Sequence, residues 1–525
     1  MKRLLTLLMC LALVLLSIPA AVAEEPVTLT YAVAMDILSL DPTFCYDWYS
    51  LPVVNQICET VLVFDQNDQL QPGLASAWEN PDPLTYVYQI RDNVTFSDGT
   101  PMTMDDVLFC LNRTKNPETA SYLGWMFSSV ESFEQTGDWE LTAKLSAPDA
   151  MFKYTMATTA ASIFSKAYFE AHPEDFGSAT GGVMGTGPYV FSSWKSGTEL
   201  VLEKNANYWN PESATGNIGK IVFKVVSEFA TLATALKNGE VDFINNVQTD
   251  LADAVLNEAN LKVEAMPTFG LHYLSYNTSY PPLDDVNARK ALSLCIDREK
   301  LMTNIIKYTG EKGTELPSGE SLWVFEKDTW AAASAAIDPY EYDLERAKEC
   351  LAASQYPDGF EVTFTIAPNT LARQTALMLQ SEAAKIGITV NITEVTEDEN
   401  TALYFGGMDR NYEIILCSWN SDYPDPAGNL EPLFHSANAG EGGANAPMYQ
   451  NPEFDALLDQ SKASTDNVER TELLLKAVEL LNADHPYHVL DYMKMTCISN
   501  AKLSNMNLGG SWAWNMYIKT WTMGE

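Results

Sequence analysis

Short apolar runs and helix-like segments alternate along most of this 525-residue chain. Residues 28–34 alternate between apolar and polar side chains, which predicts a strand near the N-terminus. Further on, residues 229–236 place an apolar stripe on one helical face, with Ser227 as the expected N-cap and Gly239 as the stop. Residues 241–244 predict the next strand. A strand, a helix and a strand in succession are typical of an α/β protein.

Later segments repeat this pattern and have clear helix starts. Thr103 is an expected N-cap, followed by two aspartates in the first turn and then by apolar residues at helical spacing. Another helix is expected after Asp285. A helix over residues 371–386 is followed by an alternating strand at 388–392. The chain shows no internal repeat and no low-complexity linker.

Residues 414–426 form the most informative apolar run. The run begins as a buried strand and ends in Asn, Ser, Asp and two prolines, which cannot continue a sheet. Trp419 and Asp422 therefore lie three residues apart where a strand leaves its sheet, a common place for ligands in open α/β folds. Asp422 can meet a positive group of a ligand, and Trp419 and Tyr423 can form apolar walls. The alternative is that the aspartates cap a turn and Trp419 belongs to the core.

An aromatic patch near the N-terminus is a second candidate for a pocket wall. Tyr46, Trp48 and Tyr49 follow the stop formed by Asp41 and Pro42. Large aromatic side chains serve equally well as core and as pocket lining. The sequence leaves both interpretations open.

The first residues have the features of an export signal. Lys2 and Arg3 precede an apolar run from Leu4 to Ile18, and a small-residue cleavage site ends at Ala23. This pattern predicts a secretory signal peptide over residues 1–23. The run is short for a membrane span of about 20 residues. Lipidation at Cys10 is not expected, because the bulky Met9 precedes it.

Composition narrows the possible functions. The chain carries 70 acidic and 32 basic residues, for a net charge of −38. This acidity disfavours nucleic acid as a partner, because nucleic-acid binding needs a basic face. Acidity also keeps an exported protein soluble and can attract cationic ligands.

Cysteine and histidine spacing does not predict a metal centre. The seven cysteines beyond the predicted signal peptide are widely spaced and contain no C-x-x-C, so most are expected to be small core residues, although one long-range disulfide stays possible. His485 and His488 form the one close histidine pair in the sequence, and Pro486 disturbs helical spacing between them. With no other ligand nearby in sequence, ordinary packed histidines are expected there, and no metal or cofactor.

Motifs of common enzymes are absent from the sequence. It contains no G-x-x-x-x-G-K-[ST] phosphate loop and no G-x-S-x-G nucleophile elbow. Gly185-Thr186-Gly187 lacks the third glycine of a dinucleotide site. A secreted glycosidase stays open as an alternative, because its two carboxylates are recognised by geometry and not by spacing.

Several stretches share their order and spacing with one known group of proteins. They are residues 70–78, 90–101 and 105–107, Gly185–Tyr189, Asn207–Trp209, Gly239–Asp242, residues 287–298 and Trp419–Pro426. With these stretches the chain resembles the bacterial extracellular solute-binding proteins of family 5, the dipeptide- and oligopeptide-binding group of ABC importers. The likeness covers nearly the whole mature chain.

The resemblance implies an α/β, two-lobed periplasmic-binding-protein-like fold of class II type, with a cleft and a hinge. Lobe I would comprise residues 24–66, 187–278 and 492–525. An extra domain, residues 67–186, would be inserted in lobe I, and lobe II would comprise residues 279–491.

The resemblance also implies a role. The chain would be a receptor without enzymatic activity, a monomer in the periplasm or on the cell-surface exterior, that delivers a solute to the transmembrane permease of an ABC importer. In peptide-binding members, the aspartate three residues after the tryptophan of this motif pairs with the ligand's α-amino group, and that position is Asp422 here. Trp419, Tyr423, Tyr46, Trp48 and Tyr49 would wall the cleft.

One departure bears on the ligand. Dipeptide binders place an arginine for the ligand carboxylate a little before the helix that here contains Arg373. Residues 364–369 contain no arginine. We therefore expect a longer peptide held through its backbone, with an oligosaccharide or a nickel complex as alternatives within the same family.

Overall fold

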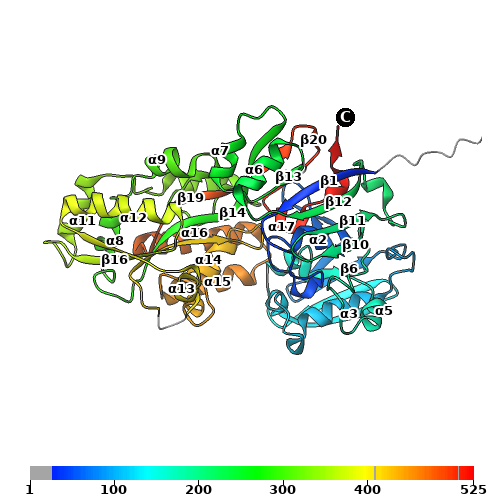
Figure 1. Cartoon of the computed structure of the whole chain (residues 1–525). Coiled ribbons are helices and arrows are strands. Elements are labelled where there is room, and N and C mark those ends of the chain that lie inside the picture. Colours follow the sequence, from blue (N-terminus) through cyan, green and yellow to red (C-terminus); the bar gives the residue numbers. More distant parts are fainter. Residues whose placement is uncertain (1–25, 407–409, 507, 525) are drawn as a thin grey trace, which may run out of the picture.

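A computed structural model describes residues 26–406, 410–506 and 508–524. The predicted signal peptide and Cys10 lie outside these residues. The fold is α/β and two-lobed, as predicted, and Figure 1 shows the two lobes side by side. One mixed sheet of eleven strands runs through the described residues. In spatial order its strands are β10 (Tyr189–Lys195), β11 (Glu199–Lys204), β12 (Ile218–Val225), β1 (Val27–Val33), β13 (Phe243–Ile244), β19 (Tyr487–Asn500), β14 (Leu261–Tyr276), β18 (Ile414–Asn420), β16 (Glu361–Ile366) and β17 (Thr389–Glu394), with β15 (Gly310–Lys312) pairing with β19.

Two long strands, β14 and β19, join the lobes (Figure 1). They have 16 and 14 residues and pair antiparallel over most of their length. An ordinary strand has about five or six residues, so these two belong to both halves of the molecule. Their register shifts between Pro267 and Leu271, and again between His272 and Tyr273. Such bulges bend a strand and redirect its side chains, and here they lie in the middle of the crossing.

The predicted strand–helix–strand unit lies in the first lobe. Helix α6 (Phe229–Lys237) connects β12 to β13 and buries Leu232 and Leu236 as expected. The expected cap at Ser227 is wrong. The N-cap is Glu228, without a side-chain hydrogen bond, and Phe229 is 48% exposed. The helix begins one residue later than Ser227 requires, so that hydroxyl is too far from the first free amides to cap them.

A separate four-stranded sheet packs beside this lobe. Its order is β5 (Ala75–Asp82), β6 (Thr85–Ile90), β8 (Glu140–Leu145) and β7 (Val130–Gly137). Helix α3 (Met104–Lys115) covers it, and Thr103 with Asp106 forms a full capping box. The predicted helix start at Thr103 is confirmed. The apolar core under the four-stranded sheet is continuous with the core of the first lobe.

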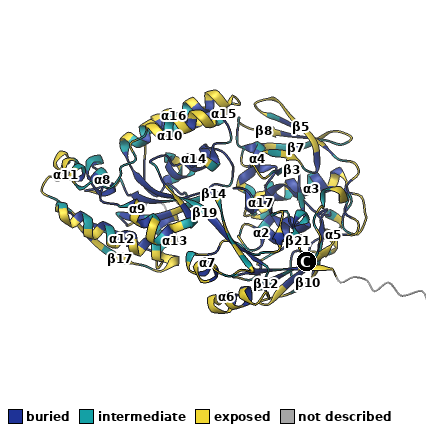
Figure 2. Ribbon diagram, turned by 90° about the horizontal axis from the view of Figure 1, so that it is seen from above, coloured by how far each residue is buried: buried dark blue, intermediate teal, exposed yellow. Residues whose placement is uncertain are grey.

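Helices surround the strands of the second lobe, with their exposed faces outward (Figure 2). They include α8 (Val286–Ser293), α11 (Leu344–Ala353), α12 (Thr370–Ala383), α13 (Glu397–Phe405), α14 (Ala427–Phe434), α15 (Pro452–Ala463) and α16 (Asn467–Asp484). Two apolar clusters lie inside this lobe. The expected helix after Asp285 is confirmed, because the Asp285 carboxylate accepts hydrogen bonds from the amides of Asn287 and Ala288.

The seven cysteines of the described residues are free, and six of them are buried. Among the helices in the described ranges, none has both the length and the apolar character needed to cross a bilayer.

The domain boundaries inferred from the resemblance remain a proposal. One of them, at residue 492, falls inside β19, so the chain would pass between lobes in the middle of a strand.

Candidate functional site

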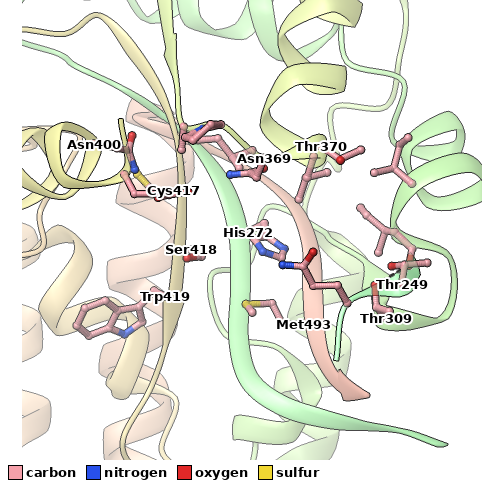
Figure 3. A pocket seen from close by; sticks show the side chains of 18 of the residues that line it. Thr249, His272, Thr309, Asn369, Thr370, Asn400, Cys417, Ser418, Trp419 and Met493 are labelled. Carbon is pink, nitrogen blue, oxygen red and sulfur yellow. Dashed lines mark hydrogen bonds between the residues drawn. The ribbon is translucent and has the colours of Figure 1, made fainter. Parts of the chain in front are cut away.

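A cavity of about 810 Å³ lies against the crossing strands β14 and β19. Figure 3 shows side chains from both lobes around it. From the first lobe come residues 247–250, at the start of α7 (Thr249–Val255). From the second lobe come residues 367–371 before and within α12, residues from α13, and residues 416–419 of β18. Ligand cavities of roughly 300–1,000 Å³ between domains commonly take small molecules.

Strand β18 places Trp419 in this wall. Residues 414–417 are mostly buried and pair with β14 on one side and β16 on the other, which confirms a central strand. Trp419 lines the cavity, and its indole Nε1 lies 3.4 Å from the carbonyl oxygen of Gly428. Asp422 comes three residues later, after the strand has ended at Asn420. It does not itself line the cavity.

Asp422 contacts one residue from near each end of the chain, Tyr46 and Trp514. The hydroxyl of Tyr46 lies 3.0 Å from each carboxylate oxygen of Asp422. The indole of Trp514 donates to the backbone carbonyl of Asp422 at 2.9 Å. Burial raises the pKa of Asp422 to about 7, although the hydrogen bond from Tyr46 acts in the opposite direction. The hydrogen bond from Tyr46 therefore does not offset the cost of burying the negative charge of Asp422, and a cation placed here would stabilise that charge.

The aromatic candidates Tyr46, Trp48 and Tyr49 do not line the cavity. Tyr46 stacks on Trp514, with ring centroids 6.4 Å apart. Trp48 stacks on Trp512 at 4.8 Å and is 40% exposed, so it presents one open face. Tyr49 is half-buried against the core of the first lobe.

Tyr423 has a structural position. It is 7% exposed, and its hydroxyl lies 2.9 Å from that of Thr155. Its ring stacks on Tyr154 and packs near Trp125. Tyr423 thus joins the loop after β18 to the part of the chain around the four-stranded sheet, and this contact holds the neighbouring Asp422 in place.

A histidine–aspartate pair that the sequence patterns missed lies in the cavity wall. His272 of β14 lines the cavity, and its Nδ1 lies 3.0 Å from Oδ1 of Asp491 on β19. The two residues are 219 positions apart. Local periodicity could place each on a strand, but only strand pairing brings them together.

The cavity wall holds no arginine among the described residues. Arg373 lies on α12, and its guanidinium pairs with Glu394 at 2.5 Å. The residues before α12 that reach the cavity are Ala367, Pro368 and Asn369. This agrees with the absence of an arginine noted in the sequence.

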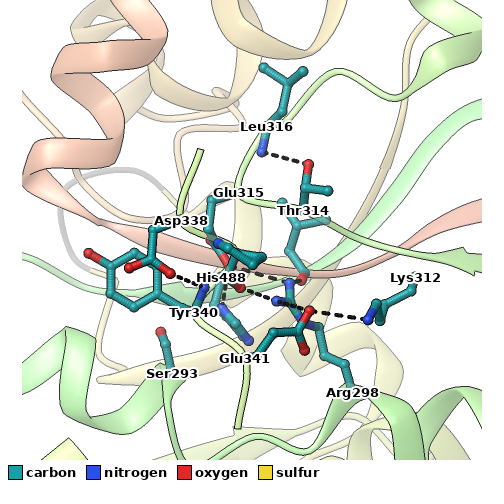
Figure 4. A network of polar contacts seen from close by, with 12 residues as sticks. Ser293, Arg298, Lys312, Thr314, Glu315, Leu316, Asp338, Tyr340, Glu341 and His488 are labelled. Carbon is teal, nitrogen blue, oxygen red and sulfur yellow. Dashed lines mark hydrogen bonds and ion pairs between the residues drawn. The ribbon is translucent and has the colours of Figure 1, made fainter. Parts of the chain in front are cut away.

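His485 and His488 belong to a fully buried polar cluster in the second lobe, and Figure 4 shows His488 beside Glu315. No other ligand lies near these histidines in the sequence, but the fold brings the carboxylate of Glu315 close to both of them. His488 Nδ1 lies 2.7 Å from Glu315 Oε1, and Arg298 Nη1 lies 3.4 Å from the same oxygen. The fold creates this proximity over about 170 residues of chain. With a guanidinium already beside the carboxylate, the cluster is a buried polar network around Glu315.

Burial dominates the titration of this cluster. It raises the pKa of Glu315 to about 7 and lowers the pKa of His485 to about 3. The pKa of His488 is also held well below its ordinary value by burial, with the charge of Arg298 acting in the same direction. These groups are therefore biased toward their neutral forms.

Comparison with known proteins places this geometry in a family. The family described as "Bacterial extracellular solute-binding proteins, family 5 Middle" matches residues 69–441. Heme-binding protein A of Haemophilus influenzae is 27% identical over 501 residues, covering 88% of this chain and 86% of that protein. Glutathione-binding protein GsiB of Pectobacterium atrosepticum is 25% identical, covering 94% of each chain.

Solved structures show the same architecture. HbpA2 from Haemophilus parasuis superposes with a TM-score of 0.81 at 25% identity, covering 95% of this chain and all of that one. The periplasmic binding protein DppA from Helicobacter pylori, in complex with the peptide STSA, gives a TM-score of 0.75 at 25% identity and covers 95% of this chain and 98% of that one.

The fold and the cavity between two lobes define a solute-binding protein. The chain belongs to family 5 of the bacterial extracellular solute-binding proteins. It is the extracytoplasmic solute-binding receptor of an ABC importer, and its relatives are binding proteins and not enzymes.

Proposed function

We propose that this receptor binds peptides in the cavity between its lobes, oligopeptides in preference to dipeptides, and delivers them to the permease of its importer. The observation that carries the proposal is Asp422, a carboxylate two residues beyond the end of β18 whose pKa is raised to about 7 by burial. An α-ammonium group is the ordinary peptide feature that would satisfy such a carboxylate. Related proteins named for glutathione and for a peptide complex support a peptide-type ligand.

The described contacts suggest how the ligand would be held. Trp419 would form one wall of the cavity, and Tyr46 would orient Asp422 by the two 3.0 Å contacts. Trp48 and Tyr49 are proposed to lie near the ligand when the lobes close. Closure would exclude water and so strengthen the charge-assisted bond between the ammonium and Asp422. The closed form would dock as a monomer on the permease, in the periplasm or at the cell-surface exterior.

The absence of an arginine in the cavity wall supports a ligand longer than a dipeptide. A dipeptide gains much of its affinity from its two charged ends, whereas a longer peptide adds backbone and side-chain contacts. A cavity of about 810 Å³ leaves room for such a ligand.

Thermal shift with peptides tests the proposal. Purified protein is screened against di- to hexapeptide mixtures, oligosaccharides and nickel complexes. A ligand at about 100 times its Kd adds about 2.7 kcal/mol of stability, which shifts the melting temperature visibly. We expect stabilisation by peptides with a free amino terminus, weakened about 10- to 100-fold by N-acetylation or by Asp422→Asn.

The matched control is Asp455→Asn, because Asp455 accepts a backbone hydrogen bond from Ser436 at 2.9 Å and does not line the cavity. Peptide affinity should stay unchanged in that variant. Stabilisation by sugars or nickel complexes and by no peptide would overturn the proposal.

A further inference from the structure

The pair His272–Asp491 has one enclosed end and one open end. The side chain of Asp491 is 0% exposed, whereas that of His272 is 25% exposed and faces the cavity (Figure 3). Strand β15 closes over the carboxylate at Gly310, where an added Cβ would lie only 2.4 Å from Asp491 Oδ2. Asp491 is therefore out of reach of a ligand, and the imidazole Nε2 is the atom of the pair that a ligand can meet.

Strand register places His272 on the same side of the sheet as the segment that leads to Asp422. His272 lies opposite Ser418 of β18, and both residues line the cavity. Asp422 is four residues further along the same chain. At about 3.3 Å per residue, the segment from Ser418 to Asp422 is at most about 13 Å long, and His272 lies about 5 Å to its side on the neighbouring strand. An extended peptide spans about 3.3–3.6 Å per residue, so about four residues would cover the distance at its upper limit and three would cover a shorter one.

The charge of the pair decides what His272 can bind. Burial by itself lowers the pKa of His272, but the charge of Asp491 and the hydrogen bond with it raise that pKa above its ordinary value. A protonated imidazole whose Nδ1–H points at Asp491 presents Nε2–H to the cavity as a donor. A transition metal would need the unprotonated nitrogen, so the raised pKa favours an anionic acceptor over a metal.

The other charged groups around the cavity leave this role to His272. Lys494 of β19 lines the cavity, but its ammonium is paired with Glu311 of β15 at 2.6 Å. Asp250 from α7 and Glu397 from α13 also line the cavity and would repel an anion. His272 and Lys494 are the two cationic side chains among the described lining residues, and each pairs with a carboxylate that does not line the cavity. His272 differs because its contact with Asp491 uses Nδ1, so that Nε2 is left to face the cavity.

We propose that His272 binds the terminal carboxylate of the ligand, with Asp491 as the positioning residue that keeps the imidazole charged and oriented. This inference rests on the proposed peptide function and sharpens it: the preferred ligands are tri- and tetrapeptides with both termini free. The crossing strands β14 and β19 then supply the carboxylate anchor, and the loop after β18 supplies the amino anchor.

Competition binding tests the inference. An equimolar tetrapeptide library built from Ala, Ser, Phe and Lys is offered with free carboxyl termini or fully amidated, and retained peptides are quantified by mass spectrometry at pH 5.5, 7.0 and 8.5. Wild-type protein should prefer the free-carboxyl library by about 10-fold or more at pH 5.5. The preference should shrink as the pH rises through the pKa of His272, because the neutral imidazole no longer attracts an anion.

Two variants separate recognition from folding. His272→Gln should lose both the preference and its pH dependence. Asp491→Asn removes the charge that raises the imidazole pKa, so its preference should disappear at a lower pH than in the wild type. The control His172→Gln removes a histidine that also pairs with an aspartate, Asp175, at 3.2 Å but lies outside the cavity. It should behave as wild type.

The outcomes are distinguishable from failure of the peptide function itself. Equal binding of the free and amidated libraries, with both still sensitive to N-acetylation, overturns the role of His272 and leaves the peptide proposal standing. Binding of neither library overturns both. An unchanged preference in His272→Gln overturns the role of His272 even if Asp491→Asn fails to fold.

Discussion

Two of the histidine–carboxylate pairs in this protein behave in opposite ways. In the cavity wall, His272 and Asp491 lie 3.0 Å apart and the imidazole is partly exposed. Inside the second lobe, His488 and Glu315 lie 2.7 Å apart and neither is exposed. The pKa of His272 is raised, whereas the pKa of His488 is lowered.

Environment explains the difference. Where the imidazole keeps contact with a cavity, attraction to the carboxylate outweighs the cost of burial. Where both partners are enclosed and Arg298 already sits beside Glu315, burial dominates and the histidine loses its proton. The same residue types thus serve for ligand recognition at one place and for packing at the other.

The largest expected effect is in the buried cluster. Arg298→Met removes the cation beside Glu315 and leaves the Val489 carbonyl, which Arg298 Nη1 contacts at 2.9 Å, without that donor. We expect a loss of about 3–5 kcal/mol in the free energy of unfolding, measured by urea denaturation. Arg373→Met, which breaks an exposed pair with Glu394, should cost about 1 kcal/mol or less. Similar losses in both variants would contradict the role given to the buried cluster.

The second effect is acid sensitivity of the same cluster. The folded protein keeps His485 neutral down to a pKa of about 3, whereas the unfolded chain binds that proton below about 6.5. The contribution of His485 to stability therefore falls as the pH drops from about 6.5 toward 3. Between pH 6.5 and 4.5, the free energy of unfolding should fall by about 1–3 kcal/mol less in His485→Gln than in the wild type. Urea denaturation at each pH measures this difference. An unchanged slope would show that His485 is charged in the folded protein.

The pH dependence of stability that comes from Asp422 should have the opposite sign to that of His485. Free Asp422 holds its proton up to a pKa of about 7, while the unfolded chain releases it near 4. Its contribution to the stability of the ligand-free protein therefore falls as the pH rises from about 4 to 7. In Asp422→Asn, the free energy of unfolding should fall by about 1–2 kcal/mol less over this pH range than in the wild type. This magnitude allows for the partial exposure of the carboxylate. If the contributions of Asp422 and His485 changed with pH in the same direction, the contrast between the ligand site and the buried cluster would be wrong.

The smallest effect concerns the hydroxyl that contacts Asp422. Tyr46→Phe removes a hydrogen bond that lowers the pKa of Asp422, so that pKa should rise further, with a cost of about 0.5–1.5 kcal/mol in stability above neutral pH. Carboxyl-carbon NMR titration of Asp422 measures the pKa directly. Tyr49→Phe is the control, because Tyr49 has no hydrogen bond to Asp422 among the described contacts. A lower pKa in Tyr46→Phe would contradict the assigned contact.

The local patterns predicted much of the fold. The helix capped by Thr103 and the strand at 414–420 are both present. Each depends on neighbours a few residues away: a side chain reaching the third amide, or an apolar run stopped by prolines. The cap predicted at Ser227 failed for a related reason, since the first turn of α6 begins one residue later.

The candidate site was predictable only in part. The sequence motif singled out Trp419 and Asp422, and the structure places Trp419 in the cavity wall and Asp422 just beyond it. It did not indicate His272, because His272 acquires its partner through a strand 219 residues away.

What the sequence determined by itself is therefore local and familial: where strands stop, where helices are capped, and which ordered motifs mark family 5. The tertiary structure alone decided which carboxylate each histidine meets and whether water reaches the pair. Charge and pKa depend on burial and on partners brought together by strand pairing, and neither is encoded in the spacing of residues along the chain.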